Sequence, residues 1–136
     1  MDMRATLEAE LHRRRERNQR YSLRAFARAL QTHHSTLSQI LQSRRRLTPR
    51  SIRQLGVRIG LTPAQIRDAC LAEHCASIRR LIGHPQFRAD SRWIAMMAGI
   101  PLDDVNVALH WLLYRRELTM AEPGTWTLGE RSCPIP

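Results

Sequence analysis

Two short helices joined by a tight turn are predicted by residues 22–41, which read SLRAFARALQTHHSTLSQIL. Ser22 is a typical helix N-cap, and Phe26 and Leu30 follow it at a spacing that places both on one helical face. A break is expected at residues 31–33. The second helix then repeats the apolar spacing with Leu37, Ile40 and Leu41.

This spacing is that of a helix-turn-helix, in which a small residue is needed where the two helices cross. Ala27 meets that need. Helices are also expected on both sides of the pair. Residues 4–17 are rich in helix-favouring residues, Thr48-Pro49 is a cap followed by proline at the first helical position, and Gly60 ends that helix. The run Thr62-Pro63-Ala64-Gln65 repeats the start signal as a capping box.

The second half of the chain is predicted to contain further helices, one of which carries Ile78, Leu81 and Ile82 and stops at Gly83-His84-Pro85, and a β-hairpin. Asp90 can cap a helix over residues 91–98, with Gly99 as its stop. Residues 102–116 carry apolar side chains at intervals of three and four, the clearest amphipathic pattern in the chain. Two β-prone runs flank Pro123-Gly124, which indicates a hairpin turn.

A boundary between two domains is expected where the apolar register becomes irregular, around residues 73–76. We therefore predict a first domain at residues 1–74, a second at 75–128 and a flexible tail at 129–136, where two prolines disfavour regular structure.

The net positive charge belongs to the first half of the chain. Residues 1–62 carry 14 arginines against four acidic side chains, which accounts for the net charge of +10, whereas residues 63–136 carry eight of each. This asymmetry predicts that the first half faces a polyanion. A membrane surface is the other candidate, but the apolar run at residues 93–102 is too short to cross a bilayer, and the charged first 20 residues are unlike a signal peptide.

Residues 22–41 resemble the helix-turn-helix of phage-repressor-type domains. The likeness extends over residues 20–128, about four fifths of the chain, which resemble a family of bacterial transcriptional regulators. In that family a repressor-like domain leads directly into a winged helix. In the second half the likeness rests on apolar spacing in Ile78-Arg79-Arg80-Leu81-Ile82, Trp93-Ile94-Ala95, Gly99-Ile100, residues 105–113 and Trp126-Thr127-Leu128.

The resemblance implies a mainly α fold, with a repressor-like five-helix domain followed by a winged helix with a short β-hairpin. It also implies sequence-specific DNA binding that regulates transcription. One position departs from the family, which usually has glycine or asparagine in the turn where this chain has Gln31. A left-handed backbone costs a long side chain roughly 1–2 kcal/mol, so we expect a remodelled turn or a strained Gln31.

The implied recognition helix offers four polar side chains to base edges, namely His34, Ser35, Ser38 and Gln39. Phosphate contacts are implied for Arg24, Arg44, Arg45 and Arg46. Arg28 and the run Arg13-Arg14-Arg15 are further candidates for the flanking DNA backbone. The alternative interpretation of all these side chains is a solvated polar surface.

No metal site, cofactor or catalytic site is predicted. Cys70, His74 and Cys75 are near one another in sequence, but they lack the spacing of a zinc site, and a cysteine is often a small buried side chain. The three cysteines are interpreted as reduced thiols of a cytoplasmic protein, which for a DNA binder means association with the nucleoid. Asp103 and Asp104 are expected in the first turn of a helix, where the helix dipole favours them.

The helix at residues 102–116 has a second apolar stripe on its outer face, formed by Val107, Trp111 and Tyr114. An exposed apolar stripe with aromatic residues is typical of a contact surface. Acids at the start of this helix would repel phosphates, so we expect it to join two subunits of a homodimer rather than to read DNA. The alternative is that the hairpin or the first domain covers the stripe.

Two other functions fit parts of the pattern. A protein-interaction adaptor, such as an antitoxin or an assembly factor, would use the same helices on a protein partner. A nonspecific architectural DNA binder would use the basic half without reading bases. The basic first half and the polar helix face favour DNA over the adaptor, and tight binding to random DNA with no preferred site would favour the architectural function.

Overall fold

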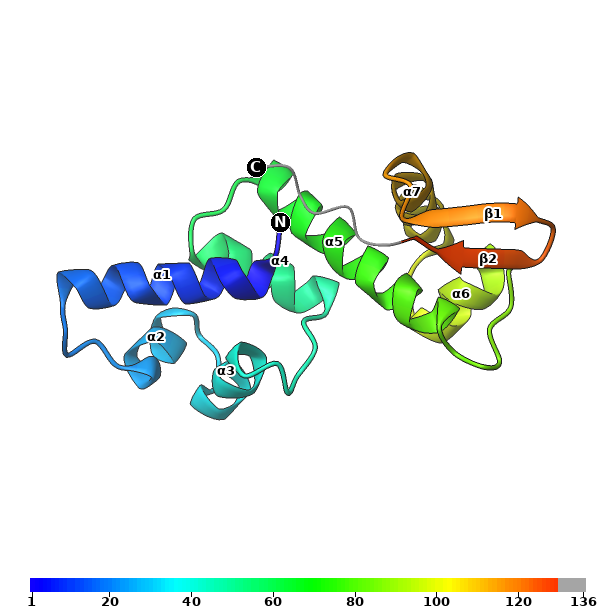
Figure 1. Cartoon of the computed structure of the whole chain (residues 1–136). Coiled ribbons are helices and arrows are strands. Elements are labelled where there is room, and N and C mark those ends of the chain that lie inside the picture. Colours follow the sequence, from blue (N-terminus) through cyan, green and yellow to red (C-terminus); the bar gives the residue numbers. More distant parts are fainter. Residues whose placement is uncertain (130–136) are drawn as a thin grey trace. The chain divides into compact units, whose positions relative to one another are not determined.

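The protein is mainly helical. The computed structural model describes residues 1–129, in which seven helices and one two-stranded sheet form two compact units, Met1–Glu73 and a second that begins at His74 (Figure 1). The predicted mainly α class with a short hairpin is confirmed. Residues 130–136 of the predicted tail, Cys133 among them, lie outside the described residues. None of the helices within residues 1–129 is long and apolar enough to cross a membrane.

The helices of the first unit are α1 (Met3–Arg17), α2 (Leu23–Ala29), α3 (His34–Leu41), α4 (Pro49–Arg58) and the start of α5 (Pro63–Ile82). Three of them, α2, α4 and α5, begin at the caps that the sequence predicts. The side chains of Ser22 and Thr48 each accept a hydrogen bond from the backbone N–H three residues later. Thr62 and Gln65 form the predicted capping box, in which each side chain accepts from the other residue's backbone N–H. These bonds satisfy donors that a helix start leaves open.

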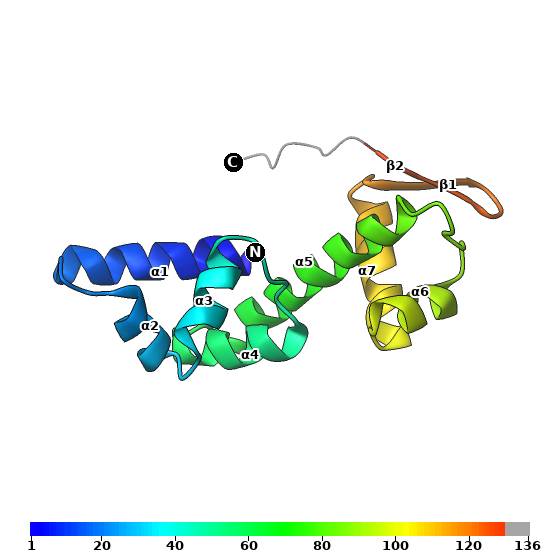
Figure 2. The same ribbon diagram turned by 90° about the horizontal axis from the view of Figure 1, so that it is seen from below.

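One apolar core holds the first unit together, and each of its helices contributes to it. The largest side chains that are fully buried there are Leu7, Phe26, Leu37 and Ile52. Ala27 is only 2% exposed, in keeping with its role as the small residue between α2 and α3. In both views α2 and α3 lie beside α1 (Figure 1, Figure 2). The helix-turn-helix is therefore held in place by the core that it shares with α1, α4 and α5, and not only by its own turn.

The second unit joins the rest of α5 to α6 (Ser91–Ala98), α7 (Leu102–Tyr114), β1 (Leu118–Glu122) and β2 (Thr125–Leu128). Asp90 caps α6, and Gly99 ends it with a left-handed φ of 67°, as predicted. The strands are antiparallel and form the predicted hairpin, with Leu118 opposite Leu128. The core of this unit contains Ile78, Ile94, Val105 and Leu112, which are all fully buried.

Two element boundaries differ from the sequence prediction. α5 is one continuous helix from Pro63 to Ile82, so the irregular register around residues 73–76 marks no break. Instead the side chains before it serve the core of the first unit, and those after it serve the second. α7 ends at Tyr114, two residues early, because Arg116 adopts a left-handed φ of 58° that a helix cannot continue through.

A buried group of charges in the second unit was not predicted. Glu117, only 4% exposed, lies between the end of α7 and the hairpin and forms ion pairs with Arg79 of α5 and Arg115. A buried carboxylate is tolerated when cations and hydrogen bonds compensate its lost hydration. The cluster therefore fixes the start of the hairpin to two helices.

Candidate nucleic-acid interface

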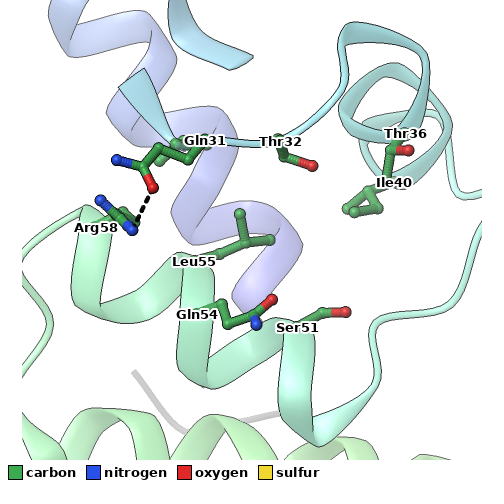
Figure 3. Close-up of a pocket in the computed structure, with 9 residues that line it drawn as sticks. Gln31, Thr32, Thr36, Ile40, Ser51, Gln54, Leu55 and Arg58 are labelled. Carbon is green, nitrogen blue, oxygen red and sulfur yellow. Dashed lines mark hydrogen bonds between the residues drawn. The ribbon is translucent and has the colours of Figure 1, made fainter. Parts of the chain in front are cut away.

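The turn between α2 and α3 adopts the left-handed backbone that the sequence analysis considered. Gln31 has a φ of 53°, which a non-glycine residue rarely adopts. The backbone N–H of Thr32 donates to the carbonyl of Ala27 at 3.0 Å, which closes the end of α2. The Gln31 side chain then accepts a hydrogen bond from Arg58 at the end of α4 (Figure 3). The turn is thus strained, as expected of a glutamine there, and is tied to α4.

α3 is fixed on its inner side by two buried side chains, Leu37 and Ile40. Its last turn is also held from α1, because Arg4 Nε donates to the carbonyl of Ile40 at 2.8 Å. The contact satisfies one of the carbonyls that a helix end leaves open. A helix held at its core and at its C-terminal end presents its outer side chains in fixed positions.

The side of α3 that faces α4 borders a small hollow of about 240 Å³ (Figure 3). Thr36 and Ile40 line it from α3, and Ser51 and Gln54 line it from α4. Thr36 and Ile40 are four residues apart, so they share a face of the helix. This flank of α3 therefore faces α4 across the hollow.

The outward face of α3 is polar. Of the four residues predicted to contact bases, His34, Ser35 and Gln39 are exposed and Ser38 is half-buried. Ser35 and Gln39 lie four residues apart, opposite the buried side. Gln42, the C-cap of the helix, is exposed too and lies seven residues after Ser35, so it extends the same face. Gln42 was not among the predicted residues, although its spacing from Ser35 is visible in the sequence.

The four arginines predicted to contact phosphates are all exposed. Arg44, Arg45 and Arg46 lie in the loop between α3 and α4, and the backbone N–H groups of Arg44 and Arg45 donate to the carbonyl of Gln39 at 2.8 and 3.2 Å. The start of this loop is thereby folded against the end of α3. Within residues 1–129 none of the three, nor Arg24 on α2, forms an ion pair. Their charges face solvent.

The run Arg13-Arg14-Arg15 is used differently from the loop arginines, because its side chains bind within the unit. Glu10 forms ion pairs with Arg13 at 2.7 Å and with Arg14 at 2.9 Å. Arg14 also donates to the hydroxyl of Tyr21 at 3.0 Å, and Arg15 donates to the Tyr21 carbonyl at 3.3 Å. These contacts tie α1 to the segment that enters α2.

Cys70, His74 and Cys75, the residues weighed as metal ligands or nucleophiles, all lie on α5 and are buried. Within residues 1–129 no three His, Cys, Asp or Glu side chains gather as metal ligands. Cys75 is buried and its thiol donates to the carbonyl of Ala108 at 3.8 Å. Burial raises the pKa of the Cys75 thiol, which opposes formation of a nucleophilic thiolate.

The outer face of α7 carries the predicted apolar stripe. Val107, Trp111 and Tyr114 are 57%, 41% and 75% exposed, and the rings of Trp111 and Tyr114 stack with centroids 6.0 Å apart. Asp103 and Asp104 lie in the first turn of the helix, as expected.

Residues 7–69 match the sequence model of a family described as a helix-turn-helix domain. The match covers slightly less than half of the chain, lies within the first unit and includes α2 and α3. It confirms the predicted helix-turn-helix and supports a DNA-binding family of that type for the first unit. No curated protein and no solved structure gives a significant match to the chain.

Proposed function

We propose that this protein binds duplex DNA at specific sequences through α3 and thereby regulates transcription. The observation that carries the proposal is the polar outward face of α3, which is held from behind by a buried core and ends beside the exposed Arg44-Arg45-Arg46 cluster. A helix of this kind fits the major groove, where base edges differ.

In this proposal His34, Ser35, Ser38 and Gln39 contact bases, and Gln42 extends their reach. A glutamine amide pairs with adenine through one donor and one acceptor, which makes Gln39 the residue best suited to select one base. Ser38 is half-buried, so it contacts a base only where the groove approaches the helix closely.

The arginines of the proposal position the helix and do not read sequence. Arg44, Arg45 and Arg46 bind phosphates past the C-terminal end of α3, and Arg24 binds them from α2. Guanidinium forks suit phosphate oxygens, and release of counterions makes such contacts sensitive to salt.

The finer architecture belongs to the same proposal: a repressor-like five-helix arrangement for the first unit and a winged helix for the second. We assign DNA binding to the first unit alone, because residues 63–136 have no net charge and α7 begins with two acids. The second unit joins two copies in a homodimer through its exposed stripe. In this proposal the protein catalyses no reaction and needs no cofactor. It acts in the cytoplasm, at the nucleoid.

The test is selection of bound fragments from a random duplex library with the full chain. We expect an enriched motif with a preferred base at several positions. Tight binding without any enriched motif would replace this proposal with a nonspecific architectural function. Failure to bind any duplex at low salt would favour a protein-interaction adaptor.

A further inference from the structure

We propose that two copies of this chain pair through α7 in an antiparallel arrangement, with Asp104 of each copy beside Arg115 of the other. The inference deepens the homodimer of the proposed function, but it rests on the second unit and is tested without DNA. The exposed apolar stripe indicates a contact surface but does not identify the partner. The charges at the two ends of the stripe identify the partner as a second copy of the chain.

The contact surface follows one line along the helix. Asp104, Val107, Trp111 and Tyr114 are separated by three, four and three residues. This spacing keeps side chains on one side of a helix over several turns, as at the contact of two paired helices. Val105, Ala108, Leu109 and Leu112 bury the opposite side in the unit's own core, so the line faces outward.

The two ends of this line carry opposite charges. Asp104 lies in the first turn of α7 and is half-buried, while Arg115 is the C-cap and its side chain is 43% exposed. The two residues lie on the same flank of the line, because eleven residues make close to three full turns. The line is therefore acidic at one end, apolar in the middle and basic at the other end.

A surface with this charge pattern is complementary to itself only when reversed. In an antiparallel pair with its two-fold axis at the level of Leu109, Val107 packs against Trp111 of the second copy. Each Asp104 then faces an Arg115, because a two-fold axis across antiparallel helices brings matching flanks together. A parallel pair would place acid against acid and arginine against arginine, which is unfavourable.

Arg115 has room for this second partner. Its Nε lies 3.2 Å from Glu117 Oε1, which uses one edge of the guanidinium. A guanidinium has five N–H donors, so its other nitrogens remain available to a carboxylate from outside. The same arginine thus links the buried Glu117 cluster to the surface of the helix.

The test uses two single variants, Asp104→Arg and Arg115→Asp, of the full chain without DNA. In the homodimer of either variant both contacts join like charges, so we expect the dissociation constant to rise at least about 10-fold. In a mixed dimer the introduced arginine of one variant faces the introduced aspartate of the other, and the unchanged Arg115 faces the unchanged Asp104. Both contacts then join opposite charges. Native mass spectrometry of a 1:1 mixture should therefore show the mixed dimer dominating both homodimers.

A second pair of variants tests the apolar middle. Trp111→Glu should raise the dissociation constant at least about 30-fold in sedimentation, since central aromatic residues dominate such contacts. Met96→Glu is the matched control, because Met96 is an exposed apolar side chain of α6 in the same unit, and it should dimerise like the parent. Circular dichroism checks that each variant is folded.

Three results would overturn the inference. The first is a parent chain that is monomeric at tens of micromolar, and the second is a Trp111→Glu variant that dimerises like the parent. The third is a mixture of folded charge variants with no excess of mixed dimer, which would exclude the antiparallel register. DNA binding by a monomeric parent would leave the proposed DNA binding standing, while the homodimer and this inference fail.

Discussion

In the proposed function, Gln39 is the side chain on which base reading depends most directly. It is exposed at the middle of the outward face of α3, and its backbone carbonyl is held by the loop that follows. We expect Gln39→Ala to relax preference at one base position, at a cost of roughly 1–3 kcal/mol on the preferred site, with nonspecific affinity nearly unchanged. Binding assays on duplexes altered one base pair at a time measure this.

Gln54→Ala is the matched control for that experiment, since Gln54 is an exposed glutamine on α4 that borders the hollow rather than the outward face of α3. Its selectivity should equal that of the parent. Unaltered selectivity of Gln39→Ala at every position would remove Gln39 from the reading surface.

Gln31 is the residue of the helix-turn-helix, residues 22–41, that has a left-handed backbone. Its left-handed backbone is unfavourable for any residue with a Cβ, while its hydrogen bond with Arg58 offsets part of that cost. Gln31→Gly and Gln31→Ala both remove the bond, but only glycine removes the strain. We expect the glycine variant to be about 1 kcal/mol more stable than the alanine variant in urea unfolding. Equal stabilities would mean that the turn changes conformation when the side chain is lost.

At the scale of elements, the proposed function makes the loop between α3 and α4 an electrostatic contact with DNA. If Arg44, Arg45 and Arg46 each neutralise one phosphate, replacing all three with alanine should reduce the slope of log affinity against log salt by about 3. The loss of affinity should be similar on all sequences. The control replaces three exposed arginines outside the helix-turn-helix, Arg67, Arg88 and Arg92, which removes the same charge. A triple loop variant with the parent's slope would place the loop away from DNA.

The ion pairs of Glu10 with Arg13 and Arg14 predict how the stability of the first unit depends on pH. Burial alone would raise the pKa of Glu10, but the hydrogen bonds and charges of Arg13 and Arg14 outweigh burial and lower it. A carboxyl whose pKa is lower in the folded chain adds stability above its unfolded pKa and loses it as pH falls through the folded pKa.

Glu10→Gln should therefore be less stable than the parent near about pH 7, and the difference should shrink as pH falls below about 4. Urea unfolding at stepwise pH measures it. Glu8→Gln is the control, because it makes the same substitution at an exposed position of the same helix, away from the ion pairs of Glu10 with Arg13 and Arg14. A difference that stays constant with pH would mean that Glu10 acts through packing and not through its charge.

The elements that the sequence predicted are those whose signals are local. Ser22, Thr48 and the pair Thr62 and Gln65 form their caps within three residues, and Gly99 needs only its own backbone freedom to end α6. Such signals are complete within one turn of helix, so they are legible without a tertiary structure. The polar face of α3 follows for the same reason from its spacing.

The features of the structure that the sequence did not predict depend on contacts between segments that are distant in the chain. Arg4 meets the carbonyl of Ile40, Gln31 meets Arg58, and Glu117 meets Arg79 across the fold, and no local pattern pairs these residues. The hydrogen bond of Arg14 with Tyr21 was not predicted for the same reason. In the sequence alone, Arg13-Arg14-Arg15 resembles a solvated basic segment. The continuity of α5 was hidden because one helix serves two cores, which interrupts its apolar period.

At the scale of the whole molecule, the proposed function divides the tasks of the two units by charge. The basic excess lies in residues 1–62, and the balanced second half offers an apolar stripe with opposite charges at its ends. A single small helix-turn-helix reads few base pairs, so joining two copies doubles the length of DNA that is read. Dimerisation would then contribute to specificity although the second unit touches no base.

This division predicts how the protein responds to the spacing of its binding site. A symmetric dimer requires two half-sites about one helical turn, or about 10 base pairs, apart. Inserting about half a turn between them places the half-sites on opposite faces of the duplex. The parent should then bind only as tightly as it binds a single half-site, while Trp111→Glu, as a monomer, should bind the original and the lengthened site equally. Both are measured by titrating the two duplexes with each protein at one salt concentration. A parent that binds both duplexes equally would show that the copies read DNA independently, whatever their association in solution.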